Sequence, residues 1–487
     1  MNVVFILADD LGWADTTLNG HTRLYDTPNL ERLAERGMLF NRAYSASPLC
    51  SPTRASILTG QTPARHGSTA PQHHLGVVRL NSSEKDQDAP DRKAIGVNSA
   101  TRLDNSLPTL AKQFQAAGYA TGHFGKWHLG FEPYTALEHG FDVDIPHFNG
   151  PGPAGGFVAP WAYDSIDPDF AEQHIEDRMA EEAVKWMQSL EKDKPFFLNY
   201  WMFSVHAPFD AKNELIEKYR HKIDRNEPQH SPTYAAMIES MDDAVGTLMD
   251  AVEAAGLTDR TVFIFTSDNG GNMYNGILET DAIGEEFIAA PTSNAPLRGG
   301  KATIYEGGIR VPTVIAWPGV TKPGSKSEVI IQSTDYYPTL LINLGIDLPV
   351  NHIVDGVNIM PALEGDHLDR KGIITYFPHS PGVPEWLPFS VALHSGDWKL
   401  IRLFHHGENG AHDYRLYNLK EDIGETNDVS KLHPERVKRM DAFIEEYLSD
   451  SSAALPQRNP RFNPNVFKPE SIGVQNGGLR VEKRIVR

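Results

Sequence analysis

The sequence predicts an α/β protein with a large mixed, mostly parallel sheet flanked by helices, followed by a smaller antiparallel sheet with one helix. Two observations predict this class. Short apolar runs alternate with helical patterns through most of the chain, which is typical of parallel sheets. Toward the C-terminus the runs become shorter and are separated by Pro, Gly and Asp turns. The 487 residues, 40% of them hydrophobic, suffice for one large and one smaller core.

The first part of the chain carries five apolar runs that we predict as strands of the large sheet. They are residues 3–8, 120–125, 196–201, 262–267 and 313–317. Helices are expected between them at 29–36, 107–117, 171–190 and 231–255. The helix at 29–36 has clear boundaries in the sequence, because Thr27 and Pro28 are typical of a helix start and Gly37 of a helix end.

The C-terminal part predicts an antiparallel sheet and one helix. The expected strands are 373–376, 390–394, 398–404 and 415–418, and the helix is 434–448. The change in pattern predicts three units: a large α/β domain over 1–369, a small subdomain over 370–450, and an extended, Pro-rich tail over 451–487.

The charge balance excludes some partners. Lys and Arg number 45 against 64 Asp and Glu, which gives a net charge of −19. Nucleic acid is therefore not expected as a partner, and an anionic substrate would need a local basic pocket. No run of 18 or more apolar residues predicts a membrane helix. The composition predicts no oligomeric state.

Acidic and amide side chains directly follow two predicted strands. Asp9 and Asp10 come after 3–8, and Asp268 and Asn269 come after 262–267. Ligands bind at the carboxyl ends of parallel strands, and carboxylate and amide oxygens suit Ca²⁺ or Mg²⁺. Turn formation is the alternative for each cluster, but two such clusters after buried strands favour a metal site.

Cys50 is the only cysteine, so it forms no internal disulfide. It is either a buried packing residue or a chemically active one. Cys50 precedes a short helical stretch that starts with Pro52 and stops at Gly60, and a helix N-terminus favours an anionic ligand. Arg54, one turn further on, can reach back to the same point.

Four further side chains are candidates for the same pocket. Lys126 and His128 are two residues apart at a strand end and can face one side. His206 follows the strand at 196–201, and Lys301 lies in a Gly-rich loop. Each alone is explained as a buried histidine or a solvated lysine, but together they indicate an anion site beside a metal.

These motifs resemble the type I, formylglycine-dependent sulfatases of the alkaline-phosphatase-like superfamily. The resemblance covers residues 1 to about 450 and rests on six segments: Asp9-Asp10, the C-x-P-x-R run at 50–54, 125–130, His206, 268–270 and 297–312. It implies an alkaline-phosphatase-like fold and one Ca²⁺ at Asp9, Asp10, Asp268 and Asn269, with Cys50 beside them. It also implies that a formylglycine-generating or sulfatase-maturing enzyme converts Cys50 to formylglycine, hydrated to a geminal diol.

The resemblance also implies a mechanism. One hydroxyl of the diol attacks sulfur, and the second then expels sulfate by reforming the aldehyde. Lys126 and Lys301 would stabilise charge on the sulfuryl group, and Arg54 and His128 would hold the diol. His206 is the candidate general acid for the leaving oxygen.

The substrate prediction rests on the C-terminal part. Its candidate substrate-binding residues are His379, Trp386, Arg402, His405 and His406. The pattern is similar to bacterial polysaccharide sulfatases, which implies a sulfated carbohydrate such as an algal galactan (carrageenan) and a periplasmic or secreted enzyme whose signal peptide is absent from this chain. Alternatives are a glycosaminoglycan or aryl sulfatase, a phosphonate or phosphate monoester hydrolase, and an inactive sulfated-glycan binding protein. For Trp386, packing within the small subdomain is the competing interpretation.

Overall fold

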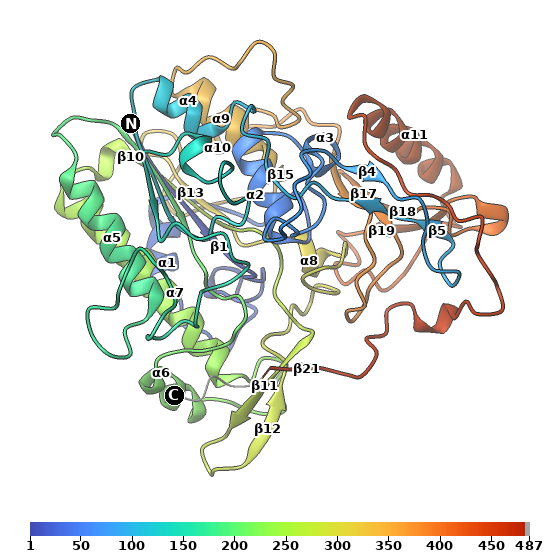
Figure 1. Cartoon of the computed structure of the whole chain (residues 1–487), viewed down its shortest axis with the longest axis horizontal. Helices are drawn as coiled ribbons and strands as arrows, with labels where there is room; N and C mark the ends of the chain where they lie inside the picture. The colour runs from blue at the N-terminus through green and yellow to red at the C-terminus, as the bar shows by residue number, and fades with distance from the viewer. Residues whose placement is uncertain (483–487) are drawn as a thin grey trace.

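The computed structural model describes residues 1–482, which form a large eight-stranded sheet and several smaller ones (Figure 1). The order in the large sheet is β14-β2-β13-β10-β1-β9-β7-β8. The strands are β14 (Ser325–Ser327), β2 (Met38–Phe40), β13 (Val314–Ala316), β10 (Thr261–Ser267), β1 (Asn2–Ala8), β9 (Phe196–Trp201), β7 (Ala120–Gly125) and β8 (Val143–Ile145). Only β13 runs against the others, so the sheet is mostly parallel.

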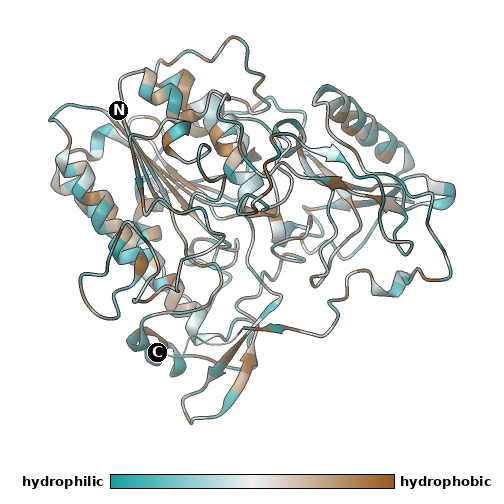
Figure 2. Cartoon of the chain, in the orientation of Figure 1, coloured by the Kyte–Doolittle hydropathy of each residue, from teal (hydrophilic) through white to brown (hydrophobic). Residues whose placement is uncertain are grey.

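Helices cover both faces of this sheet, which explains why its central strands are buried along their whole length and are mostly apolar. Alternate residues of β1 show the two layers. Val4 and Ile6 lie in a core with α1 (Pro28–Arg36), α5 (Ile175–Ser189) and α7 (Pro232–Ala254). Val3 and Phe5 lie in a second core with α2 (Cys50–Thr59), α4 (Leu110–Ala116) and α9 (Tyr336–Asn343). Figure 2 shows these strands as predominantly hydrophobic.

The predicted fold class is confirmed, and several element boundaries differ. β1, β7, β9 and β10 lie within one residue of the predicted runs. The helix expected from residue 107 begins at Leu110, because Thr109 is the N-cap and its hydroxyl accepts a hydrogen bond from the Lys112 N–H. The helix expected from 171 begins at Ile175. β2, β8 and β14 are three residues each and were not predicted.

The small antiparallel sheet has one face on a helix and the other on the large domain. Its strands are β16 (Ile373–Phe377), β17 (Ser390–Ser395), β18 (Trp398–Leu403) and β19 (Asp413–Asn418), paired in that order. Leu400 packs in a cluster with α11 (Pro434–Asp450), whereas Ile401 and Leu403 pack in a cluster with Leu49 and Ala302. The second face therefore lies against the neighbours of Cys50 and Lys301.

The end of the chain forms two strand pairs with distant segments. β20 (Gln457–Arg458) pairs with β5 (Ala94–Ile95). The tail then crosses the molecule, and β21 (Arg480–Val481) pairs with β11 (Asn275–Thr280), which forms a projecting hairpin with β12 (Glu286–Ala289) (Figure 1). The hairpin was not predicted, and the domain boundaries at 369 and 450 remain predictions. Among the described residues, no helix has the length and apolarity needed to span a bilayer.

Candidate active site

Four oxygen-bearing side chains meet where β1 and β10 end. The two strands are parallel neighbours with Ala8 opposite Ser267, so the residues that follow them are adjacent. Asp9, Asp10, Asp268 and Asn269 are all fully buried. The Asp10 N–H donates to Asp268 Oδ1 over 3.2 Å, and Asn269 Nδ2 donates to Asp10 Oδ1 over 2.8 Å. The fold thus joins the two acidic segments into one site.

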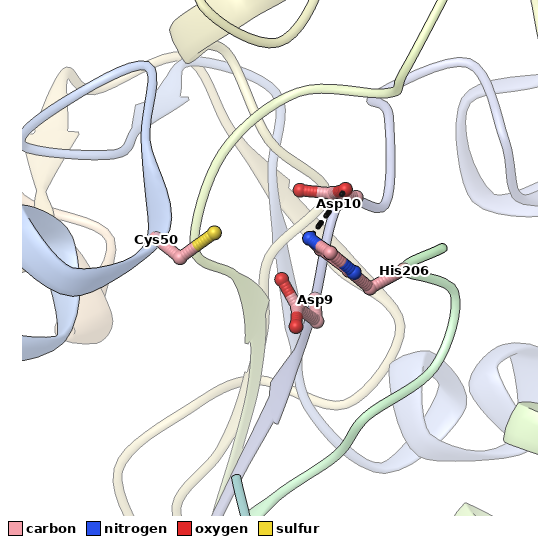
Figure 3. A group of neighbouring side chains, drawn as sticks. All are labelled: Asp9, Asp10, Cys50 and His206. Atoms are coloured by element: carbon pink, nitrogen blue, oxygen red, sulfur yellow. Dashed lines mark ion pairs between the residues drawn. The ribbon is translucent and has the colours of Figure 1, made fainter. Parts of the chain in front are cut away.

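Cys50, the first residue of α2, points its sulfur into this site (Figure 3). Its Sγ and ligand atoms of Asp9, Asp10 and His206 all lie within 4.8 Å of one another. The N-cap residue Leu49 has no capping side chain, so the helix presents its first N–H groups at this end. Burial raises the pKa of the Cys50 thiol to about 12. As a thiol, the group is therefore protonated and chemically inert at neutral pH.

Three buried cations pair with the three carboxylates. Lys126 Nζ lies 2.5 Å from Asp9 Oδ2, and Lys301 Nζ lies 2.7 Å from Asp10 Oδ2. Arg54 Nε donates to Asp268 Oδ2 over 2.9 Å, and its Nη1 donates to the Lys126 carbonyl over 2.7 Å. Although the chain carries a net charge of −19, the site itself holds a dense set of positive groups suited to an anion.

The oxygen set fits a hard divalent cation. Asp9 Oδ1 and Asn269 Oδ1 are buried and have no hydrogen-bond partner among the described residues. Buried polar atoms without partners are rare in folded proteins, and at such positions a water or an ion usually binds. Burial, together with the nearby Asp9 carboxylate, raises the pKa of Asp268 to about 6. A divalent cation would offset this repulsion, so the residues present fit Ca²⁺ or Mg²⁺.

Two histidines complete the site. His206 Nε2 lies 3.8 Å from Asp10 Oδ2, and its Nδ1 lies 2.5 Å from the Ala207 carbonyl, which places the ring proton on Nδ1. His128 Nε2 lies 3.1 Å from Nδ1 of His74, a residue that no sequence motif singled out. Burial lowers the pKa of both His206 and His128 well below the usual value, and the next cause is the charge of Lys301 and Lys126 for His206 and of Lys126 for His128. Both rings are therefore neutral at pH 7.

The predicted substrate-binding residues do not share one location. His379 Nε2 lies 2.9 Å from Thr69 Oγ1. Trp386 and His406 line a cavity of about 450 Å³ that holds none of the predicted catalytic residues. The ring nitrogens of His405 lie 2.9 Å and 3.1 Å from the carbonyls of Gly410 and Pro456, so both nitrogens face backbone oxygens of the protein.

The prediction that Arg402 contacts the substrate requires correction. Arg402 is 1% exposed and lies on the face of β18 that packs against α11. Its guanidinium contacts Asp441 Oδ1 at 2.5 Å and Glu445 Oε1 at 2.5 Å, and donates to the Asp441 carbonyl over 3.0 Å. Its hydrogen-bonding groups thus hold α11 and do not face a substrate.

A second buried charge cluster, which the sequence did not reveal, lies behind the Lys301 loop. Lys399 of β18 lies 3.1 Å from Glu306 Oε1 and 2.7 Å from Glu425 Oε1. His394 Nε2 lies 2.7 Å from the same Glu306 oxygen. Glu425 in turn accepts the Glu306 N–H over 2.6 Å. Glu306 opens α8 (Glu306–Ile309), so this cluster connects the small sheet to the loop that carries Lys301.

Comparisons with known proteins agree with this geometry. The sulfatase family pattern matches residues 1–346, and the pattern described as N-sulphoglucosamine sulphohydrolase, C-terminal, matches 300–452. The chain is 31% identical to the N-acetylgalactosamine-6-sulfatase of Mus musculus over 76% of this chain and 67% of that protein. It is 27% identical to the N-acetylgalactosamine-6-O-sulfatase of Bacteroides thetaiotaomicron over 91% and 92% of the two chains.

A solved structure extends the comparison. The crystal structure of Ps i-CgsB in complex with k-i-k-neocarrahexaose superposes with a TM-score of 0.73 at 26% identity, covering 92% of this chain and 93% of that one. Since the family pattern spans well over half of the sequence and the expected motifs meet in one site, the chain belongs to the sulfatase family.

Proposed function

We propose that this enzyme removes sulfate from a sulfated carbohydrate with a galactose-type ring, such as an algal galactan. One observation carries the proposal: the Cys50 side chain lies within 4.8 Å of Asp9, Asp10 and His206, at the N-terminus of a helix. The two curated relatives carry N-acetylgalactosamine in their names, and the superposed structure holds a carrageenan oligosaccharide. These names share a galactose-type sugar, which supports this substrate class.

Cys50 is the proposed site of formylglycine. The unmodified thiol is a poor nucleophile, since burial raises its pKa to about 12. When present, formylglycine supplies a hydrated aldehyde with one hydroxyl for attack and a second for release. The proposed partner is therefore a formylglycine-generating or sulfatase-maturing enzyme that acts on the segment around Cys50.

Asp9, Asp10, Asp268 and Asn269 would hold the cation, and Ca²⁺ is our proposal because every donor is a hard oxygen. Ca²⁺ at this position supplies a charge that polarises the sulfate group and lowers the pKa of the nucleophile. The two unpaired buried oxygens, on Asp9 and Asn269, support this assignment.

The remaining residues of the site bind and orient. Lys126 and Lys301 provide fixed positive charge for sulfate oxygens in a site that excludes water. Arg54 holds Asp268 and the Lys126 backbone, and so positions the first turn of α2 against the strand ends. His206 presents Nε2 toward Asp10 and is the proposed proton donor to the leaving oxygen once it carries a second proton.

Alternative activities differ in substrate and not in architecture. An aryl or glycosaminoglycan sulfatase would use the same sulfate site, and a phosphonate or phosphate monoester hydrolase would use the same fold. The galactose-type relatives favour the galactan, and a polymeric anionic substrate favours action in the periplasm or outside the cell, because such a polymer does not cross a membrane.

A substrate panel combined with mass spectrometry tests the proposal. Active enzyme should show a loss of about 18 Da in the peptide containing Cys50, and Cys50→Ala should abolish turnover without changing the thermal unfolding temperature. A sulfated galactan hexasaccharide should be hydrolysed faster than a nitrophenyl sulfate or the matching phosphate ester. Full activity with wholly unmodified Cys50, or preference for the phosphate ester, would refute the proposal.

A further inference from the structure

A cavity of about 450 Å³ lies between the small sheet and the tail, with walls from three distant segments. These segments are 91–94, 380–389 and 466–476, together with Phe404 and His406, which follow β18. The third wall lies beyond residue 452, where the family match ends. Only this third wall lies outside the residues that the family patterns match.

Aromatic rings form much of the lining. Trp386, Phe389, Phe404 and Phe467 all contribute to it. Trp386 Nε1 lies 3.0 Å and 3.1 Å from the carbonyls of Ser471 and Val474, so the indole is fixed to the tail in a defined orientation. Rigid aromatic faces with a few polar groups at the edge are the usual lining of small-molecule pockets.

Positive charge surrounds these rings. Arg92, Lys93 and Lys468 line the cavity against a single carboxylate, that of Asp91. Lys93 Nζ lies 5.1 Å above the Phe467 ring and donates to the His406 carbonyl over 2.8 Å. The Arg92 guanidinium lies 5.7 Å from the Phe389 ring. Arg92 Nε also lies 3.6 Å from Asp88 Oδ1, so the lining keeps a modest excess of positive charge, and two of its three cations lie over aromatic rings.

The cavity is connected to the catalytic site through a chain of contacts. Arg92 Nη1 donates to Ser380 Oγ over 3.0 Å, and the adjacent His379 reaches Thr69 Oγ1 at 2.9 Å. The segment that contains Thr69 continues to His74, whose Nδ1 lies 3.1 Å from His128 Nε2. Trp386 also packs against the apolar cluster that contains Leu49, the residue before Cys50. The cavity and the catalytic site are thus connected by packed and hydrogen-bonded residues of the same segments.

We propose that the cavity binds a sulfated sugar unit other than the one whose sulfate is removed. The inference rests on the proposed function only for the identity of the ligand. Stacking on Trp386 and Phe467 provides contact area for the ring, and Lys93 and Lys468 provide charge for its sulfate. The ligand is either a further unit of the substrate chain or a unit of a separate sulfated glycan.

The experiment measures binding directly, so that it does not depend on turnover. The full-length Cys50→Ala protein is titrated by calorimetry with a sulfated galactan hexasaccharide and with its desulfated counterpart. We expect Lys468→Gln, in an exposed position of the tail, to weaken binding of the sulfated form about 3-fold to 10-fold, since one charge contact is worth roughly 1 kcal/mol. Lys93→Gln should add a comparable loss. Lys192→Gln, an exposed lysine between α5 and β9, is the matched control.

The two ligand sources differ in turnover. If the cavity binds the substrate chain itself, Lys468→Gln in the active enzyme raises KM for the hexasaccharide and leaves nitrophenyl sulfate unchanged. If it binds a separate glycan, the calorimetric stoichiometry exceeds one and KM is unchanged. The inference is overturned if both lysine variants bind the hexasaccharide like the Lys192→Gln control, or if the desulfated form binds equally well. Loss of sulfatase activity alone, with binding preserved, would refute the proposed function and leave this site standing.

Discussion

Replacing Lys399 by Met should destabilise the protein strongly, because this lysine is the cation shared by two buried carboxylates. Its ammonium lies 3.1 Å from Glu306 and 2.7 Å from Glu425, and all three side chains are fully buried. After the substitution Glu306 keeps His394 at 2.7 Å and Arg310 at 3.6 Å, whereas Glu425 loses its ion-pair partner. The change therefore leaves an uncompensated buried charge next to the α8 N-terminus.

The magnitude follows from this loss. Breaking a buried ion pair by removing one partner costs about 3–5 kcal/mol. Burial, which outweighs the attraction of Lys399, raises the pKa of Glu425 to about 7, so partial protonation offsets some of the cost at neutral pH. An unfolding entropy of roughly 2 cal/mol/K per residue gives about 1 kcal/mol/K for 487 residues. The expected fall in Tm is therefore about 3–5 °C if the chain unfolds as one unit.

Differential scanning calorimetry at pH 7.5 measures the change, with Lys192→Met as the control for loss of an exposed lysine. The double variant Lys399→Met/Glu425→Gln should recover most of the lost Tm, because it removes the unpaired charge together with its partner. A fall of less than 1 °C for the single variant, or a double variant less stable than the single one, would show that the cluster does not act as a coupled charge network.

Three further predictions concern other parts of the molecule. Burial raises the pKa of Glu176 from 4.5 to about 7, so between these pH values the folded state binds one proton more than the unfolded state, and the free energy of unfolding falls as pH rises. Glu176→Gln should reduce that fall by up to roughly 3 kcal/mol, which is measured as a smaller Tm difference between pH 5 and pH 7.5. An unchanged Tm difference contradicts this prediction. Prolonged chelation should abolish turnover, and added Ca²⁺ should restore turnover better than Zn²⁺ does. Elemental analysis of the Asp268→Ala protein should find no bound calcium, and a zinc ion held by histidines would contradict the assignment. Arg402→Met should lower Tm by about 2 °C and leave KM within 2-fold of the unsubstituted enzyme, because the Arg402 side chain contacts α11. A raised KM with an unchanged Tm would indicate that Arg402 binds the substrate after all.

The central strands and the candidate metal residues were predictable because each lies in a continuous pattern. β1, β9 and β10 are buried on both faces, so their sequences are mostly apolar and stand out without an alignment; β7 is equally buried but is less apolar, with Thr121 and His123 among its six residues. The position of Asp9 and Asp268 at strand ends then follows from the topology of parallel sheets. Strands of three residues, such as β2 and β8, are too short to show any period.

The C-terminal part shows where a pattern of residue types is insufficient. Arg402 and Leu400 share one face of β18, and that face packs on α11, as alternation from the buried Leu400 would have indicated. The substrate role expected for Arg402 was based on its charge and not on the face of the strand that carries it. The contact between His74 and His128 and the pairing of β21 with β11 are tertiary, and no local signal marks them.

The position of β1 at the middle of the large sheet also determines how late in synthesis that sheet can form. Both of its partners are synthesised late, since β9 begins at Phe196 and β10 ends at Ser267. At about 5–20 residues per second, the roughly 200 residues from Cys50 to the end of β10 take on the order of 10–40 s to emerge. Throughout that interval the segment around Cys50 has no completed sheet to fold against, whereas in the finished protein its side chain is 2% exposed. Under the proposed conversion of Cys50 to formylglycine, a maturing enzyme would thus act on the growing or newly released chain, and the rate of folding would set the fraction of molecules that become active.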